Sequence, residues 1–201
     1  MIRFADRLID GGTVLDIGAG QGRNALFLAR RGFDVHTLEP SNVAATALGA
    51  LAGRENLPFS VFTDPFGAFH PPVPSYAGIL VFGLIPDLRR GEITDLAGRV
   101  RRWSCPGALL WVTAFTTEDP AYPKWKTGTE EIDPRSFRRP DGRVRTYLEP
   151  GEILRLFPGF SPIHHWEGLG PEHRHGDGQP ERHGMAEAVF TLDSLPTGRA
   201  P

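Results

Sequence analysis

The sequence has almost no cysteine, no long apolar run and almost no net charge, and each absence excludes a class of protein. The single cysteine, Cys105, rules out a disulfide bond within the chain. No apolar stretch approaches the roughly 18 residues that a membrane-spanning helix needs. The formal net charge of -2 provides no basic excess for nucleic acid or an anionic membrane, so we expect neither as a partner.

The first residues lack the features of a secretory signal. Residues 1–6 carry charged side chains and no apolar core segment, so we expect a cytoplasmic protein. The 201 residues fit one hydrophobic core. We therefore predict a single domain over residues 1–193 and a mobile tail over residues 194–201.

Short apolar runs alternate with segments of helical periodicity along the first 115 residues. The apolar runs predict buried strands at residues 13–17, 33–38, 58–63, 76–83 and 108–115. Helices are predicted at residues 22–31, from an N-cap at Ser41 to residue 52, and from an N-cap at Asp87 to residue 103. This alternation is typical of a parallel sheet with helices on both faces.

The rest of the chain is rich in turn-forming residues. Residues 116–147 have little periodicity and predict a long loop with at most a short irregular β-ribbon. Loops of this length in compact domains are usually functional. A short helix is expected at residues 150–157, and strands at 160–166 and 185–192 flank a second long loop at 168–184.

A glycine-rich turn, Gly18-Ala19-Gly20-Gln21-Gly22, follows the first predicted strand. A dinucleotide site favours a third glycine where this chain has Arg23, which argues against an NAD-dependent oxidoreductase. Asp16, just before the turn, would repel a pyrophosphate but suits a cationic ligand. Glu39, at the end of the second predicted strand, can accept hydrogen bonds from both hydroxyls of a ribose.

Three segments, VLDIGAGQG at 14–22, VHTLEP at 35–40 and VFTD at 61–64, resemble the class I methyltransferases that use S-adenosylmethionine (SAM). The resemblance implies an α/β, Rossmann-like, doubly wound and mostly parallel seven-stranded sheet with an antiparallel last strand and helices on both faces. It implies SAM as the cofactor and S-adenosylhomocysteine as the product. The expected cofactor-binding residues are Asp16, Gly18, Ala19, Gly20, Arg23, Asn24, Glu39, Pro40, Asp64, Pro65, Phe66 and Phe82.

The resemblance assigns two of these residues to particular parts of the cofactor. Asp64 matches the acid that contacts the adenine amino group, although it could also simply cap a loop. Phe82 lies in the segment that faces the methionine part of SAM, although it could also belong to the core.

Within that family, residues 22–29 (GRNALFLA) and the closing histidine-containing hairpin look most like the small tellurite-resistance type of methyltransferase. This resemblance implies a small-molecule acceptor, such as a thiol, a metalloid oxyanion or an amine, rather than a macromolecule. We expect methyl transfer by a monomer or a homodimer.

The late histidines are candidates for the acceptor side of the site. In this architecture the sixth strand ends on the cofactor side of the sheet, so the loop after it lies over the substrate. His173, His175 and His183 could orient the acceptor or act as a general base. No cysteine or second cluster completes a tetrahedral zinc site, so we expect no bound metal. A turn-rich hairpin with histidines in purely structural roles is the alternative.

Three other functions remain open from the sequence. The first is a SAM-binding module without catalysis that regulates a partner, which would show SAM binding without turnover. An NAD-dependent oxidoreductase would be detected by titration with NADH. A metal-binding protein built on the late histidines would be detected by metal analysis.

Overall fold

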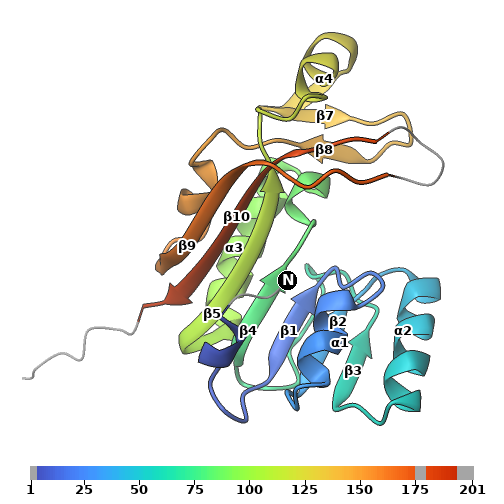
Figure 1. Cartoon of the computed structure of the whole chain (residues 1–201), viewed down its shortest axis with the longest axis vertical. Coiled ribbons are helices and arrows are strands. Elements are labelled where there is room, and N and C mark those ends of the chain that lie inside the picture. The colour runs from blue at the N-terminus through green and yellow to red at the C-terminus, as the bar shows by residue number, and fades with distance from the viewer. Residues whose placement is uncertain (1–3, 175–179, 194–201) are drawn as a thin grey trace, which may run out of the picture.

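Seven strands form one mixed sheet in the computed structural model, which describes residues 4–174 and 180–193 (Figure 1). The strand order is β3-β2-β1-β4-β5-β10-β9. The first five strands pair in parallel, whereas β10 runs antiparallel to both β5 and β9. The strands are β1 (Val14–Ile17), β2 (Val35–Leu38), β3 (Phe59–Phe62), β4 (Tyr76–Val81), β5 (Ser104–Phe115), β9 (Phe160–Leu169) and β10 (Gly184–Leu192). The predicted Rossmann-like fold with an antiparallel last strand is confirmed.

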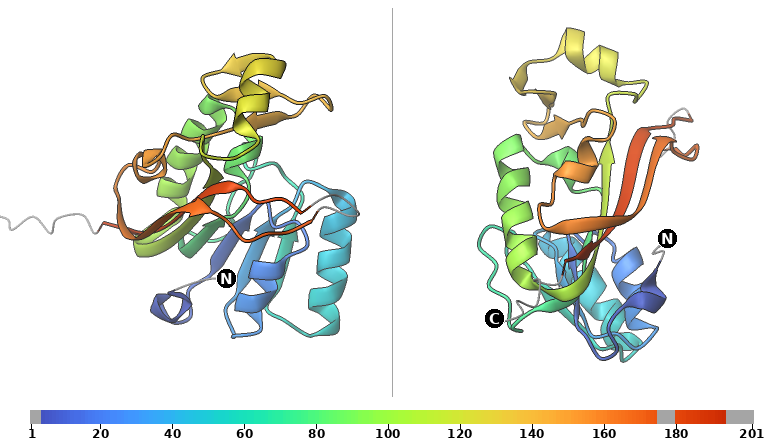
Figure 2. Two further views of the ribbon diagram at one scale, coloured as in Figure 1. Left: turned by 45° about the horizontal axis from the view of Figure 1, so that its top comes forward. Right: turned by 90° about the vertical axis from the view of Figure 1, so that its left-hand side faces the viewer.

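Helices cover both faces of this sheet (Figure 2). Alternate residues of a strand point to opposite faces, and β4 shows the result: Ile79 packs in the cluster that contains α3, and Leu80 in the cluster that contains α1. Both side chains are fully buried, which stabilises the fold by about 1.5–3 kcal/mol for each. The helices are η1 (Ala5–Arg7), α1 (Arg23–Ala29), α2 (Asn42–Arg54), η2 (Ile85–Asp87) and α3 (Arg90–Trp103).

The two predicted helix caps have different outcomes. Ser41 caps α2 as expected, because its hydroxyl accepts a hydrogen bond from the backbone N–H of Ala44 at 3.4 Å. The cap at Asp87 is wrong: this residue lies in η2, a separate 3₁₀ turn. The N-cap of α3 is Arg89, and the carboxylate of Glu92 in the first helical turn accepts the hydrogen bond from the Arg89 N–H at 2.7 Å.

Residues 116–147 contain more regular structure than the predicted loop. A short helix and a small antiparallel sheet lie above the carboxyl ends of the parallel strands (Figure 1). Phe137 and Tyr147 form its buried centre. Arg90 attaches it to α3 by donating hydrogen bonds to the carbonyl oxygens of Tyr147, at 2.5 Å, and Pro134, at 2.9 Å. The elements are α4 (Tyr122–Gly128), β6 (Glu131–Asp133), β7 (Ser136–Arg138) and β8 (Val144–Thr146).

Two further predictions need correction at the end of the chain. The helix expected at residues 150–157 is only a 3₁₀ turn, η3 (Glu152–Arg155). The loop expected at 168–184 is partly a continued hairpin, because β9 extends to Leu169 and His173 pairs with Glu181 in an antiparallel bridge. His175 and the predicted tail at 194–201 lie outside the described residues.

Among the residues that the structure describes, no helix is both long enough and apolar enough to cross a membrane.

Candidate functional site

The glycine-rich turn connects β1 to α1 and adopts a conformation that needs glycine. Gly18, Gly20 and Gly22 have φ angles of +75°, +55° and +72°, values that residues with a Cβ rarely adopt. A Cβ added at Gly22 would lie 2.2 Å from Cδ1 of Leu48. The N–H of Gly18 donates to the carbonyl of Leu38 at 2.8 Å, which holds the turn against the end of β2.

Glu39 joins the end of β2 to this turn. One carboxylate oxygen accepts a hydrogen bond from the N–H of Gly20 at 2.7 Å, and the other accepts one from the N–H of Ser41 at 2.8 Å. The residue is only 9% exposed. Its carboxylate is therefore fixed beside the turn, as a ribose-binding acid would have to be.

Asp16 is a buried carboxyl group at the base of the same turn, with 3% of its surface exposed. Burial raises its pKa from 3.8 to about 7; a backbone hydrogen bond from Ala25 opposes this shift, and the charge of Glu39 adds to it. A cation placed beside Asp16 would favour the ionised carboxylate. No cation of the protein offsets the effect of burial on the pKa of Asp16 among the causes of this shift.

Two cavities meet at Gly18. One, of about 250 Å³, is lined by Asp16, Gly18, Ala19, Gln21, Arg23, Asn24 and Phe82. The other, of about 240 Å³, is mostly apolar and is lined by Ile17, Gly18, Leu38, Pro40, Pro65, Phe66, Leu84, Leu88 and Glu92.

All but three of the predicted cofactor residues line one of these two cavities. Of the three, Gly20 and Glu39 are hydrogen-bonded to each other beside them. Asp64 is exposed just after β3, and no described contact links it to either cavity. Sequence reasoning missed Leu84, Leu88 and Glu92, which reach the apolar cavity from the turn and helix after β4.

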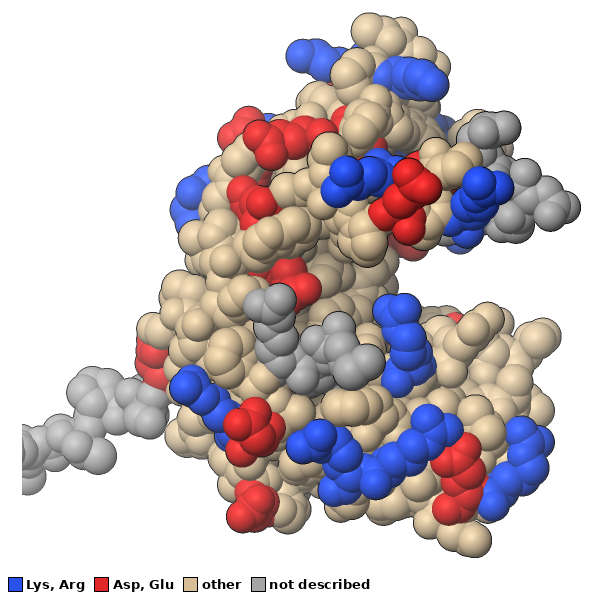
Figure 3. All heavy atoms as spheres, in the orientation of Figure 1, with Lys and Arg blue, Asp and Glu red and all other residues tan. Residues whose placement is uncertain are grey.

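A third cavity, of about 510 Å³, lies at the end of β5 and is a candidate acceptor site. Strands β1, β4 and β5 are neighbours in the sheet, and β5 continues about three residues beyond the level at which β1 ends, so the ends of β1 and β5 are roughly 14 Å apart. Figure 3 shows the surface hollowed on the cofactor side of the sheet, below the small subdomain that α4, β6, β7 and β8 form. The lining residues are Phe115, Ala121, Trp125, Arg139, Arg145, Tyr147, Glu181 and His183.

His183 is held at this cavity by Asp119, a residue that sequence reasoning missed. The Asp119 side chain is fully buried and its Oδ2 lies 2.9 Å from Nδ1 of His183. The same oxygen accepts from the N–H of Gly184 at 3.1 Å, and Oδ1 accepts from that of Ala121 at 2.7 Å. The His183 ring also stacks on Phe115 with their centroids 4.5 Å apart.

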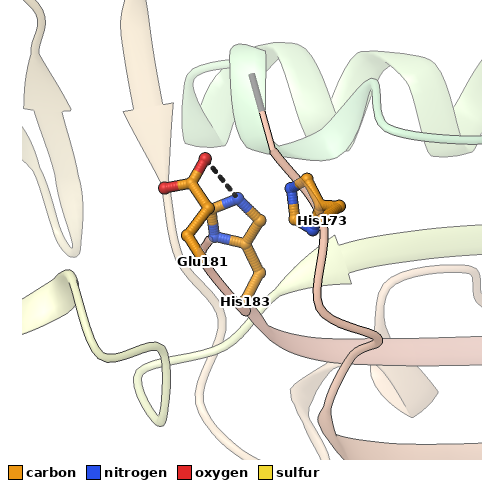
Figure 4. Close-up of side chains that lie close together, drawn as sticks. All are labelled: His173, Glu181 and His183. Atoms are coloured by element: carbon orange, nitrogen blue, oxygen red, sulfur yellow. Dashed lines mark ion pairs between the residues drawn. The ribbon is translucent and has the colours of Figure 1, made fainter. Parts of the chain in front are cut away.

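The structure brings His173 and His183 together, with ring centroids 5.0 Å apart; Glu181 lies on the His183 strand, opposite His173 in the backbone pairing (Figure 4). His164 and His165 lie farther along β9, where they pair with Glu187 and Glu167 at 3.4 and 3.1 Å. Of the three histidines predicted for the acceptor side, His173 and His183 therefore lie together, and His175 lies outside the described residues.

A family model described as tellurite resistance protein TehB matches residues 2–124. The chain belongs to this family. It is 28% identical to a protein named Hemagglutinin 1 from Eikenella corrodens over 166 residues, which are 81% of this chain and 51% of the relative. A probable SAM-dependent methyltransferase TehB from Haemophilus influenzae is 25% identical over 161 residues, which are 80% of this chain and 53% of the relative. The chain therefore spans about half the length of the curated relatives it matches.

Solved structures show the same fold. The crystal structure of TehB from Haemophilus influenzae gives a TM-score of 0.72 at 19% identity, over 94% of this chain and 60% of that one. A SAM-dependent methyltransferase from Methanosarcina mazei gives 0.77 at 17% identity, over 96% of this chain and 99% of that one.

The predicted class I methyltransferase family, related to TehB, is confirmed, and with it SAM as the family's cofactor. The acceptor class, the cytoplasmic location, the absence of nucleic acid or membrane partners and the oligomeric state stay predictions.

Proposed function

We propose that this chain transfers the methyl group of SAM to a small nucleophile bound at the end of β5. The observation that carries the proposal is the pair of cavities that meet at Gly18, one around a buried carboxyl group and the other mostly apolar. SAM has the same division: its methionine part carries an ammonium, a sulfonium and a carboxylate, and its adenine is flat and largely apolar.

The chemistry of each wall supports one orientation of the cofactor. Asp16 would lie near the ammonium and sulfonium groups, whose positive charge favours its ionised form. Glu39 would accept the ribose hydroxyls. Pro65 and Phe66 would pack beside the adenine ring in the apolar cavity. The methyl group would then point along the sheet edge toward β5.

The acceptor would occupy the 510 Å³ cavity, which combines aromatic rings with two arginines and His183. The guanidinium carbon of Arg145 lies over the Phe115 ring, 4.9 Å from the ring centroid, in a cation–π contact. An acceptor that is anionic or becomes so on ionisation, such as a thiol or a metalloid oxyanion, suits these surroundings. SAM is already a strong methyl donor, so the protein's task is to align donor and acceptor and to exclude water.

The test is turnover of SAM to S-adenosylhomocysteine with a panel of thiols, metalloid oxyanions and amines. We expect turnover with at least one thiol or oxyanion, and its loss when Arg145 is replaced by Ala. Arg143→Ala is the matched control, because Arg143 is exposed and pairs with Asp141 at 2.7 Å. SAM binding without turnover on the whole panel would reject methyl transfer and favour a non-catalytic SAM-binding module.

A further inference from the structure

Three potential metal ligands lie on one face of the hairpin that continues β9 and β10. His173 and Glu181 are directly opposite, because each donates its N–H to the other's carbonyl, at 3.0 and 2.9 Å. His183 is two residues beyond Glu181, and residues two apart in an extended strand share a face. The backbone pairing therefore brings an imidazole, a carboxylate and a second imidazole together, as Figure 4 shows.

The distances among these side chains suit a shared ion. One ligand atom from each residue lies within 4.8 Å of the others, and Nε2 of His183 is 3.9 Å from the Glu181 carboxylate. Ligand atoms around a tetrahedral zinc ion are separated by about 3.4 Å, from metal–ligand bonds of about 2.1 Å. Small side-chain rotations would close the difference.

A second set of contacts orients the two imidazoles. The buried Asp119 engages Nδ1 of His183 and directs Nε2 toward Glu181. Nδ1 of His173 lies 3.2 Å from the carbonyl oxygen of Pro171. Carboxylates and carbonyls that bind the outer nitrogen of a histidine are the usual partners of metal-ligating histidines, since they fix the tautomer with the other nitrogen as the ligand.

The charge and surroundings are also appropriate. Glu181 and Asp119 together supply two negative charges, which would balance a divalent cation. Two histidines and one carboxylate form the ligand set of several catalytic zinc and iron sites, and such a set leaves a position open for substrate. Glu181 and His183 line the 510 Å³ cavity, so that position would face the bound acceptor.

We propose that His173, Glu181 and His183 bind one divalent transition-metal ion on this hairpin, and that the open position of the ion holds an acceptor thiolate. The metal site stands whether or not the chain transfers a methyl group, whereas the acceptor assignment rests on the proposed methyl transfer. A thiol would lose its proton to solvent on binding. Its sulfur would then attack the methyl carbon of SAM while the bond from that carbon to the sulfonium breaks, releasing S-adenosylhomocysteine. The sequence alone pointed away from a metal, because the carboxylate ligand becomes visible only when the hairpin pairing is known.

The test is calorimetric titration of tag-free, chelator-treated protein with Zn²⁺, repeated with Co²⁺ and its visible absorption. We expect one equivalent of Zn²⁺ with a Kd of about 1 µM or tighter. Glu181→Gln and His173→Gln should each weaken binding at least tenfold and remove the cobalt spectrum. His165→Gln is the matched control, since His165 pairs with Glu167 outside the cluster, and it should bind as the wild type does.

The substituted side chain of Glu181 is 44% exposed, so E181Q should keep the wild-type melting temperature, and a loss of zinc in that variant is a loss of a ligand. Absence of zinc binding, or equal binding in all variants, would overturn the metal site. Zinc binding without any methyl transfer would support the metal site and reject the proposed function. Thiol methylation that is unchanged after zinc removal would overturn the acceptor role of the metal.

Discussion

Glu39 and Gly20 are joined by a hydrogen bond of 2.7 Å from the Gly20 N–H to the Glu39 carboxylate. This contact connects the end of β2 to the turn after β1, and the second carboxylate oxygen binds the start of α2 through Ser41 at 2.8 Å. A single side chain therefore fixes three segments that surround the candidate cofactor site.

Replacing Glu39 with Gln should weaken SAM binding by about 10- to 100-fold. The amide keeps one acceptor oxygen for two backbone donors and cannot receive both ribose hydroxyls, and hydrogen bonds to charged groups contribute about 1.5–3 kcal/mol each. Calorimetry measures the change. Glu55→Gln is the control, because Glu55 forms an exposed ion pair with Arg30 and should leave SAM affinity at the wild-type value. Equal affinities in both variants would contradict the role of Glu39.

Asp16 should make the apoprotein less stable as the pH rises from about 4 to about 7. Its pKa is raised from 3.8 to about 7 by burial, so the folded protein holds this proton more tightly than the unfolded chain does. Below pH 4 both states hold the proton, and above pH 7 neither does, so the loss is confined to that interval. Thermal melts of the wild type and Asp16→Asn across this pH range measure the loss of stability. A difference between them that does not vary with pH would contradict the shift.

Gly22→Ala should lower the melting temperature by about 5–10 °C. A positive φ costs a non-glycine residue on the order of 1 kcal/mol or more, and the new Cβ would meet Leu48 at 2.2 Å, giving at least about 2 kcal/mol in a protein of this size. Gly53→Ala is the control. Gly53 lies within α2 with no atom near its would-be Cβ, so alanine there should stabilise the helix by up to about 1 kcal/mol.

The parallel sheet and the cofactor turn could be predicted from sequence because their signals are local. A buried strand such as β4 is a continuous apolar run, and the turn carries its three glycines within five residues. The small subdomain could not be predicted from sequence, because β6, β7 and β8 have three residues each, which is too few for a periodic pattern. Asp119 gave no signal either: its partner His183 is 64 residues away, and only the pairing of β5 with β10 brings them together.

Asp119→Asn should reduce acceptor methylation without changing SAM affinity. An amide nitrogen in place of Oδ2 would face the N–H of Gly184 and release His183, at a cost of about 1.5–3 kcal/mol in folding free energy. We expect a higher KM for the acceptor and a lower kcat, with the SAM Kd of the wild type. Asp95→Asn serves as the control, because Asp95 forms a surface pair with Arg99 within α3. If the SAM Kd rises together with the acceptor KM, the substitution disturbs the whole site, and Asp119 does not act by positioning His183.

Calorimetric titration of SAM into the wild type, Asp16→Ala and Asp10→Ala tests the cofactor site directly. Asp10 is exposed, precedes β1 and lines neither cavity at Gly18, so its variant controls for the loss of one negative charge. We expect one SAM per chain for the wild type and Asp10→Ala, and at least tenfold weaker binding for Asp16→Ala. Failure of the wild type to bind SAM, or the same Kd in all three proteins, would contradict this expectation.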